Sequence, residues 1–226
     1  MAELYGILSI DKPAGITSAR VVSHVKRVLP RGTKIGHAGT LDPFATGVLL
    51  LLIGRATKLC EQLMESPKQY VTTVRLGATT DTDDLDSPEH PTPDVIYPTI
   101  EQIQSTLLQF IGTIQQRPPA YSAMKVGGRR AYALAREGQP VPLAERPVRI
   151  DDLRLLSYEP PDVRLQIDCG RGTYIRSIAR DLGERLQCGG YLTQLRRTRV
   201  GRFTADEALS LEKLSETTLP AHLQRM

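Results

Sequence analysis

The segment Gly36–Gly47, GHAGTLDPFATG, carries the carboxylate of this sequence that is best placed for chemistry. Three glycines and Pro43 restrict the shape of the segment, and a continuous apolar run at 47–53 follows it. A side chain on a restricted loop beside a buried strand is held in place, which is how catalytic groups are usually presented. Asp42 is therefore a candidate catalytic residue. The alternative is that it only hydrogen-bonds the backbone of its own turn, as aspartates before proline often do.

A second segment, Cys169–Arg176, leads from an expected strand into a long expected helix. Arg176 falls in the first turn of that helix, where the helix dipole disfavours a cation. We therefore expect a carboxylate partner for Arg176, although exposure to solvent would also explain it. The sequence Gly170-Arg171-Gly172 is a weak signal for a phosphate-binding loop and matches no nucleotide-binding fingerprint.

Two further segments, Arg117–Arg130 and Leu195–Arg202, concentrate cations. Residues 117–202 hold 17 Lys or Arg against nine Asp or Glu, and only Lys125 among these cations is a lysine. Arginine contacts phosphate through two parallel hydrogen bonds and stacks on bases, so this composition favours an RNA-binding surface. The alternatives are an ordinary solvated surface, or edge strands that charge protects from aggregation.

The sequence excludes several classes of site. It contains no phosphate-binding GxxxxGK loop, no HExxH motif and no GxSxG motif. The four histidines are scattered and the three cysteines form no CxxC unit, so we expect no metal, disulfide framework or cofactor. No apolar run approaches the 18 residues that a membrane span needs, and the N-terminal residues do not read as a secretion signal. We therefore expect a cytoplasmic protein without membrane contact.

The elements that must position these groups are of mixed type. Strands are expected at 4–10, 47–53, 68–76, 148–156 and 163–169, and helices after Thr17 or Ser18, at 100–111 and at 173–186. Residues 79–98, rich in Asp, Thr and Pro, are expected to form a long solvated loop. This order favours one mixed α+β domain over regular β-α-β winding.

Taken together, these segments resemble the bacterial tRNA pseudouridine-55 synthases, the TruB family. The matching pieces, in family order across almost the whole chain, are Asp11–Ser18, Gly36–Gly47, Lys68–Tyr70, Pro118–Lys125, Cys169–Gly183 and Leu195–Phe203. The resemblance implies the pseudouridine synthase fold, with a mixed, largely antiparallel central sheet flanked by helices. It also implies an isomerase that breaks the N-glycosidic bond of uridine 55 in the tRNA T loop, turns the flipped-out base and rejoins it through carbon 5.

The resemblance assigns a role to each matching site residue. Asp42 would be the nucleophile, with attack on the sugar and attack on the base both open. Tyr70 would stack on the flipped base near the proton that is lost late in the reaction. Arg176 would pair with Asp42 and keep it ionised.

Four more residues match positions around the substrate. His37, Tyr174 and Leu195 would line the pocket or hold the RNA loop. Lys12, together with Pro13, would support the active site. The implied partner is the T arm of tRNA, without a guide RNA and without a cofactor, and we expect a monomer.

The resemblance also bears on domain organisation. We expect a single catalytic domain over 1–226, with an RNA-contacting insertion at about 117–147 and a short helical tail at 204–226. The chain resembles a short form that lacks the small C-terminal RNA-binding domain of many bacterial members. Two other functions stay open. The first is an RNA-folding factor that catalyses no reaction. The second is a nucleotide-sugar or phosphate-ester hydrolase, although the sequence lacks the metal ligands or the second placed carboxylate that such an enzyme needs.

Overall fold

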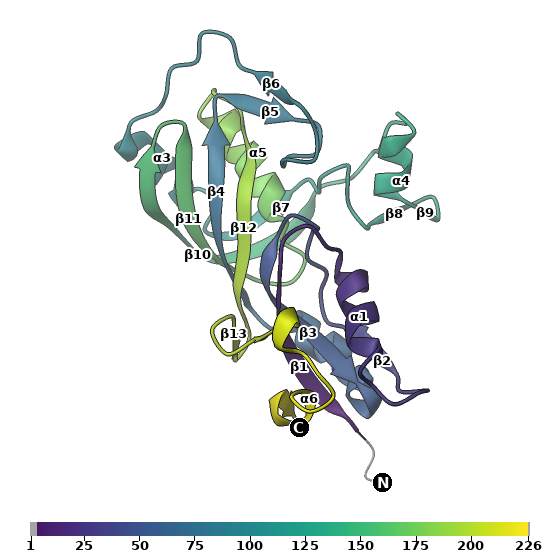
Figure 1. Cartoon of the computed structure of the whole chain (residues 1–226). Coiled ribbons are helices and arrows are strands. Elements are labelled where there is room, and N and C mark those ends of the chain that lie inside the picture. The colour runs from purple at the N-terminus through teal and green to yellow at the C-terminus, as the bar shows by residue number, and fades with distance from the viewer. Residues whose placement is uncertain (1–3, 226) are drawn as a thin grey trace. The chain divides into compact units, whose positions relative to one another are not determined.

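The computed structural model describes residues 4–225, which fold into two compact units (Figure 1). The first unit runs to Val71 and resumes at Leu195, and the second spans Thr72–Gln194. We expected a single domain over 1–226. Strands β4 (Lys68–Leu76) and β12 (Gly190–Val200) each contribute residues to both units.

The first unit is built around β3 (Thr46–Ile53), in which seven consecutive residues from Gly47 are buried. Such a run is typical of a strand that is covered on both faces. β3 pairs antiparallel with β1 (Gly6–Lys12) and β2 (Ile35–His37), and parallel with β12 where Arg196 and Arg197 lie opposite Thr46 and Gly47. The Gly36–Gly47 loop thus ends directly in the core strand.

Helix α1 (Ser18–Lys26) begins where the sequence predicted, because Thr17 Oγ1 accepts a hydrogen bond from the Arg20 N–H. Its buried residues Ser18, Val21 and Val25 face the unit's interior, and the helix packs beside β2. The 3-10 helix η1 (Gly54–Leu59) and helix α2 (Cys60–Glu65) follow β3.

The end of the chain is not only helical. Residues 204–226 include η2 (Leu211–Lys213) and α6 (Leu219–His222), but also β14 (Leu209–Ser210) and β15 (Leu223–Gln224). β14 pairs parallel and β15 antiparallel with β1, and β13 (Phe203–Thr204) pairs with β12. Strands form here because the backbone groups along β1 need hydrogen-bond partners.

The second unit is an antiparallel layer with helices packed on it. Its strand order is β12-β4-β11-β10-β7, with β11 at Asp162–Cys169, β10 at Arg146–Glu159 and β7 at Gly112–Gln116. Helix α3 (Ile100–Leu108), which starts with a Thr99–Gln102 capping box, packs against β10 and against α5 (Ile175–Arg185) (Figure 1).

Two segments of this unit have more structure than a loop. Residues 79–98 were expected to be solvated, but β5 (Ala78–Thr80) and β6 (Glu89–Pro91) form a hairpin, and Asp83 and Asp84 between them are buried. Their carboxylates pair with cations of α5, which makes their burial possible. The expected insertion at 117–147 contains the hairpin β8 (Lys125–Val126) and β9 (Arg129–Arg130), followed by α4 (Ala131–Arg136).

The expected fold class is confirmed: the structure is mixed α+β, with largely antiparallel sheets flanked by helices. The parallel pairings β1–β14 and β3–β12 make the arrangement mixed. Among residues 4–225, no helix has the length and apolar character needed to cross a membrane.

The backbone of α5 packs closely against the backbone of Gly189 and Gly190. A Cβ at Gly183 would lie 2.2 Å from both the Gly189 carbonyl carbon and the Gly190 nitrogen. Gly183→Ala should therefore lower the free energy of unfolding by about 1–3 kcal/mol through overpacking, as measured by chemical denaturation.

The control for this experiment is Gly170→Ala, where the nearest atom to the added Cβ is 3.6 Å away. This variant should unfold at nearly the wild-type denaturant concentration. Equal stability of Gly183→Ala and the wild type would mean that α5 does not need this close approach.

Candidate active site

The loop that carries Asp42 is fastened to the start of α1 on both sides of that residue. Ser18 Oγ accepts a hydrogen bond from the Leu41 N–H (2.9 Å) and donates one to the Leu41 carbonyl (3.1 Å). The Gly15 N–H donates to the Pro43 carbonyl at 2.9 Å. The Asp42 carbonyl itself accepts from the Ala45 N–H at 3.2 Å, which closes the turn. Asp42 is half-buried on a main chain that has little freedom to move.

Lys12 joins this loop to the turn that follows β1. Its side chain is fully buried, and Nζ donates to the carbonyls of Pro13 and Ile16 (both 2.8 Å) and of Pro43 (3.1 Å). The pKa of Lys12 is lowered to about 8, because the lowering effects of burial and of the Arg197 charge outweigh the raising effect of the Asp42 charge. The ammonium group of Lys12 therefore interacts electrostatically with Asp42 while it supports the loop.

Arg197 is a site residue that the sequence analysis missed. Its side chain is 2% exposed, and it donates from Nε to the Val48 carbonyl (2.7 Å), from Nη2 to Gly39 (3.2 Å) and from Nη1 to Thr40 (3.5 Å). Leu195–Arg202 was interpreted as a solvent-facing basic segment, which is wrong for Arg197. Successive side chains point to opposite faces of a strand, so this alternation indicates that Arg196 and Arg197 lie in different environments.

His37, Tyr70 and Leu195 complete the predicted residues of the first unit. Tyr70 on β4 and Leu195 on β12 are buried, and His37 at the end of β2 is half-buried. Burial and then the charge of Arg197 lower the pKa of His37, which favours its neutral imidazole. Within the described residues, the buried Nδ1 of His37 has no hydrogen-bond partner.

Arg176 and Tyr174 belong to the second unit. Arg176 is 4% exposed, and its Nη1 forms an ion pair with Asp84 Oδ2 at 3.2 Å. Its two terminal nitrogens also donate to the carbonyls of Thr82 and Tyr121, each at 2.9 Å. The expectation that a carboxylate balances this cation at the start of α5 is confirmed, and Asp84 is such a partner. The sequence analysis missed Asp84 because it treated residues 79–98 as solvated.

The next turn of α5 repeats this arrangement. Arg180 pairs with Asp83 at 3.1 Å and with Asp181 at 2.8 Å, and it donates to the Arg117 carbonyl at 2.9 Å. Ser177 Oγ donates to the same carbonyl at 2.8 Å. Burial raises the pKa of Asp83 to about 6, against the opposing effect of Arg180. One face of α5 therefore holds both the acidic hairpin loop and the start of the 117–147 insertion.

Tyr174 is the residue just before α5, and its main chain is fixed by Gln116. The Tyr174 N–H donates to Gln116 Oε1 at 2.9 Å, and Gln116 Nε2 donates to the Tyr174 carbonyl at 3.1 Å. The Arg146 guanidinium lies 5.3 Å from the centre of the tyrosine ring, within the range of a cation–π contact. Tyr174 is half-buried.

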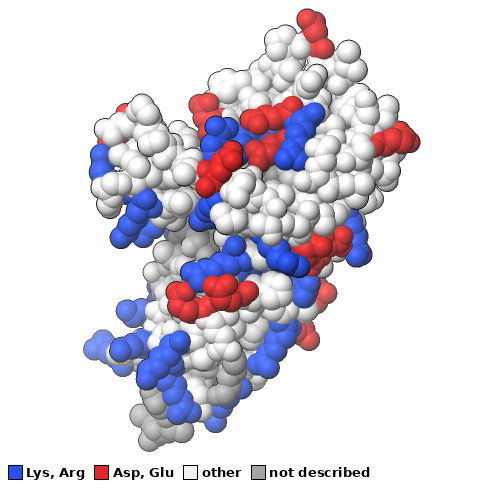
Figure 2. Space-filling view, turned by 180° about the vertical axis from the view of Figure 1, so that it is seen from behind, with Lys and Arg blue, Asp and Glu red and all other residues white. Residues whose placement is uncertain are grey.

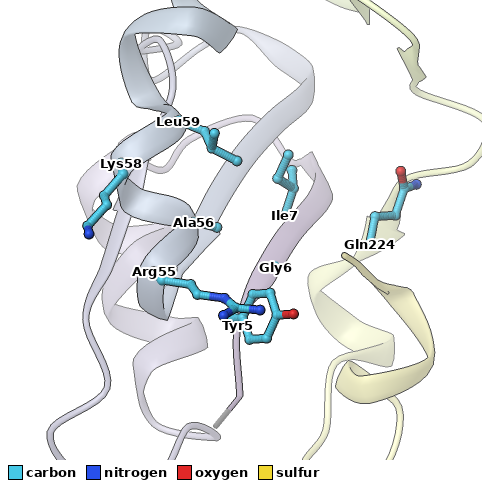
Figure 3. A pocket seen from close by; sticks show the side chains of 8 residues that line it. All are labelled: Tyr5, Gly6, Ile7, Arg55, Ala56, Lys58, Leu59 and Gln224. Atoms are coloured by element: carbon cyan, nitrogen blue, oxygen red, sulfur yellow. The ribbon is translucent and has the colours of Figure 1, made fainter. Parts of the chain in front are cut away.

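Two other features lie outside these residues. The first unit contains a pocket of about 260 Å³, and Arg55 beside it stacks on the Tyr5 ring at 3.4 Å. Figure 3 shows the side chains that line this pocket. None of the predicted site residues lines it. Among residues 4–225, no three His, Cys, Asp or Glu side chains are grouped so that they could hold a metal ion.

Comparison with protein families gives two adjoining matches. Residues 26–175 match the family model described as TruB family pseudouridylate synthase, N-terminal domain, and residues 176–225 match the tRNA pseudouridylate synthase B C-terminal domain. A curated relative, tRNA pseudouridine synthase B of Mycobacterium bovis, is 50% identical over 215 residues. These cover 93% of this chain and 72% of the relative.

Solved structures give a consistent result. A Cbf5-Nop10-Gar1 complex contains a chain that matches with a TM-score of 0.71 and 30% identity, and an H/ACA RNP bound to a substrate RNA containing 2'-deoxyuridine matches with 0.68 and 27%. Each match covers 92% of this chain but only about half of the other chain (53% and 52%). The extent of the family match and the identity to the curated relative together show that the chain belongs to the TruB family of pseudouridylate synthases.

Proposed function

We propose that this protein converts uridine 55 in the T loop of tRNA to pseudouridine, with Asp42 as the nucleophile. The name of the 50% identical relative supports tRNA as the substrate. The observation that carries the role of Asp42 is the loop itself, because Lys12, Ser18 and Arg197 all bind its main chain. If Asp42 only hydrogen-bonded its own turn, nothing would explain why two cations are buried against its loop, since the burial of a cation costs free energy.

The reaction breaks the bond between C1′ and N1, turns the uracil, and forms a bond between C1′ and C5. The proton on C5 is lost and N1 gains one, so no redox partner is needed. Whether the carboxylate attacks the sugar or the base, it must be ionised and fixed in place. The Lys12 ammonium favours the ionised form of Asp42, since an adjacent cation lowers the pKa of a carboxylate.

The remaining roles follow from the family resemblance and belong to the proposal. Arg176, itself held by Asp84, has the role of keeping the nucleophilic carboxylate ionised. Tyr70 stacks on the flipped base close to the C5 proton. His37, Tyr174 and Leu195 line the pocket or hold the RNA loop.

The surface of α1 and the turn after it provides an RNA contact in this proposal. Residues 12–41 contain no Asp or Glu, and the exposed cations there are Arg20, Lys26, Arg27, Arg31 and Lys34. None of them has a carboxylate partner within the described residues. Figure 2 shows Lys and Arg side chains projecting from the surface of the molecule. The 117–147 insertion, with Lys125, Arg129 and Arg130, provides a further contact. The partner is the T arm of tRNA, bound by a cytoplasmic monomer without a guide RNA.

Asp42→Asn should abolish pseudouridine formation and leave tRNA affinity nearly unchanged. The substitution is almost isosteric but removes the nucleophilic charge. Mass-spectrometric mapping of pseudouridine in unmodified tRNA measures the reaction, and filter binding measures the affinity. Asp162→Asn, which removes only the surface partner of Arg75, is the control and should keep full activity. Substantial turnover by Asp42→Asn would contradict the assigned nucleophile, and a wild type without turnover would favour the RNA-folding alternative.

Tyr70→Phe should keep RNA binding but slow conversion sharply. The ring that stacks on the base remains, whereas the hydroxyl near the C5 proton is lost. Single-turnover assays at saturating tRNA give the rate, and Tyr97→Phe, at a 40% exposed position outside the insertion, is the matched control. Conversion at the wild-type rate would limit Tyr70 to a stacking role.

Removal of the α1 cations should weaken tRNA binding and flatten its salt dependence. Each phosphate contact contributes roughly −0.7 to the slope of log affinity against log salt concentration. In the Asp42→Asn background, Arg20→Gln, Arg27→Gln and Arg31→Gln combined should therefore reduce the slope by up to about 2. The control is Arg75→Gln with Arg154→Gln, since both cations already have carboxylate partners. An unchanged slope would show that RNA does not contact α1.

A further inference from the structure

Arg197 is a buried cation whose hydrogen bonds all go to main-chain carbonyls. The part of the chain that the structure describes offers it no carboxylate partner. Burying a charge in this way is costly unless its hydrogen bonds are well made. A guanidinium has five N–H donors in a fixed plane, so it can hold several carbonyls at set positions, which a lysine ammonium cannot do in the same way.

The three carbonyls that Arg197 binds lie on both sides of Asp42 in the sequence. Gly39 and Thr40 precede Asp42, and Val48 belongs to β3 beyond it. One planar group therefore connects the two limbs of the loop. Ser18 and Gly15 contact the loop only at Leu41 and Pro43, next to Asp42, and do not connect its ends.

The main chain of Arg197 lies against the same loop. Gly47, the last residue of the segment, has a φ of 100°, and a Cβ there would lie 2.1 Å from the Arg197 carbonyl oxygen. The backbone of β12 thus packs on the end of the loop, and the Arg197 side chain extends to the carbonyls of Gly39 and Thr40. This approach requires glycine at position 47.

We propose that Arg197 is a positioning residue for the isomerisation, because its guanidinium clamps both limbs of the 39–48 loop and so fixes the carboxylate of Asp42. The proposal rests on the proposed role of Asp42 as nucleophile. It differs from a direct RNA contact, which the burial of Arg197 precludes. The Arg197 charge also acts on two neighbours of the loop, since it lowers the pKa of both His37 and Lys12.

The test compares Arg197→Lys with Arg197→Gln. Lysine keeps the charge but loses the planar set of donors, and glutamine loses both. Arg75→Gln is the control, because Arg75 pairs with Asp162 at 3.0 and 3.2 Å and makes no hydrogen bond to the carbonyls of Gly39, Thr40 or Val48. Rates are measured in single turnovers at saturating tRNA, at a temperature where a melting curve shows each variant folded.

Both Arg197 variants should lose about 100-fold in the single-turnover rate, the loss that a displacement of about 1 Å at a reacting group can cause. Their tRNA dissociation constants should stay close to wild type, and Arg75→Gln should keep its rate. The imidazole pKa of His37, followed by NMR, should rise in Arg197→Gln and stay nearly unchanged in Arg197→Lys. A loss of rate in both variants, with a change in the His37 pKa only in Arg197→Gln, would show that the rate depends on the geometry of the guanidinium and not on its charge alone.

Amide hydrogen exchange tests the clamp without reference to catalysis. The N–H groups of Leu41 and Ala45 should exchange faster in Arg197→Lys than in the wild type, while amides of β10 and β11 keep their protection. Wild-type rates in the Arg197 variants, unchanged loop exchange, or a rate loss explained entirely by weaker tRNA binding would each overturn the proposal. If Asp42→Asn remains active while loop exchange still rises in Arg197→Lys, the assigned nucleophile fails and the clamp stands.

Discussion

Buried positive charge is the constraint on which both units depend. Lys12 and Arg197 in the first unit and Arg176 in the second are almost completely buried. Removal of a cation from water costs several kcal/mol unless other groups replace its hydration. In the first unit, main-chain carbonyls of the Asp42 loop and of β3 accept the hydrogen bonds that water would otherwise accept from Lys12 and Arg197. The shape of the loop and the stability of the two buried cations therefore depend on the same hydrogen bonds.

The second unit meets the same constraint with carboxylates. Arg176 and Arg180 on adjacent turns of α5 pair with Asp84 and Asp83 of the hairpin loop, and both also donate to carbonyls at the start of the insertion. The acidic run at 79–98 is therefore part of the framework of α5. A carbonyl binds a cation without neutralising its charge, whereas a carboxylate binds the cation and neutralises it. The carbonyls that bind Lys12 and Arg197 therefore leave the positive charge of these residues unneutralised at the Asp42 loop.

That difference matters for the chemistry proposed here. A nucleophilic carboxylate must stay ionised in a half-buried position, where desolvation alone would raise its pKa. Cations that are bound to carbonyls keep their full charge available to Asp42. The same first unit also has an acid-free stretch from residue 12 to residue 41, so the surface near α1 and the interior near Asp42 are both electropositive. Both properties suit a polyanionic substrate and an anionic catalytic group.

The sequence alone predicted most of the element types and marked the candidate catalytic loop, although it did not predict the strands within residues 79–98 and 204–226. Glycine and proline spacing marked Gly36–Gly47, the Thr17 cap marked the start of α1, and the alternation at 68–76 predicted β4 with its observed bounds. It could not determine which charges are buried, because burial depends on partners far along the chain. Arg197 lies 158 residues from Gly39, and Arg176 lies 92 residues from Asp84, so local patterns assigned both acidic and basic runs to solvent. The tertiary structure brings each pair within hydrogen-bond distance, and it shows that Arg197 supports the Asp42 loop and that Asp84 pairs with Arg176.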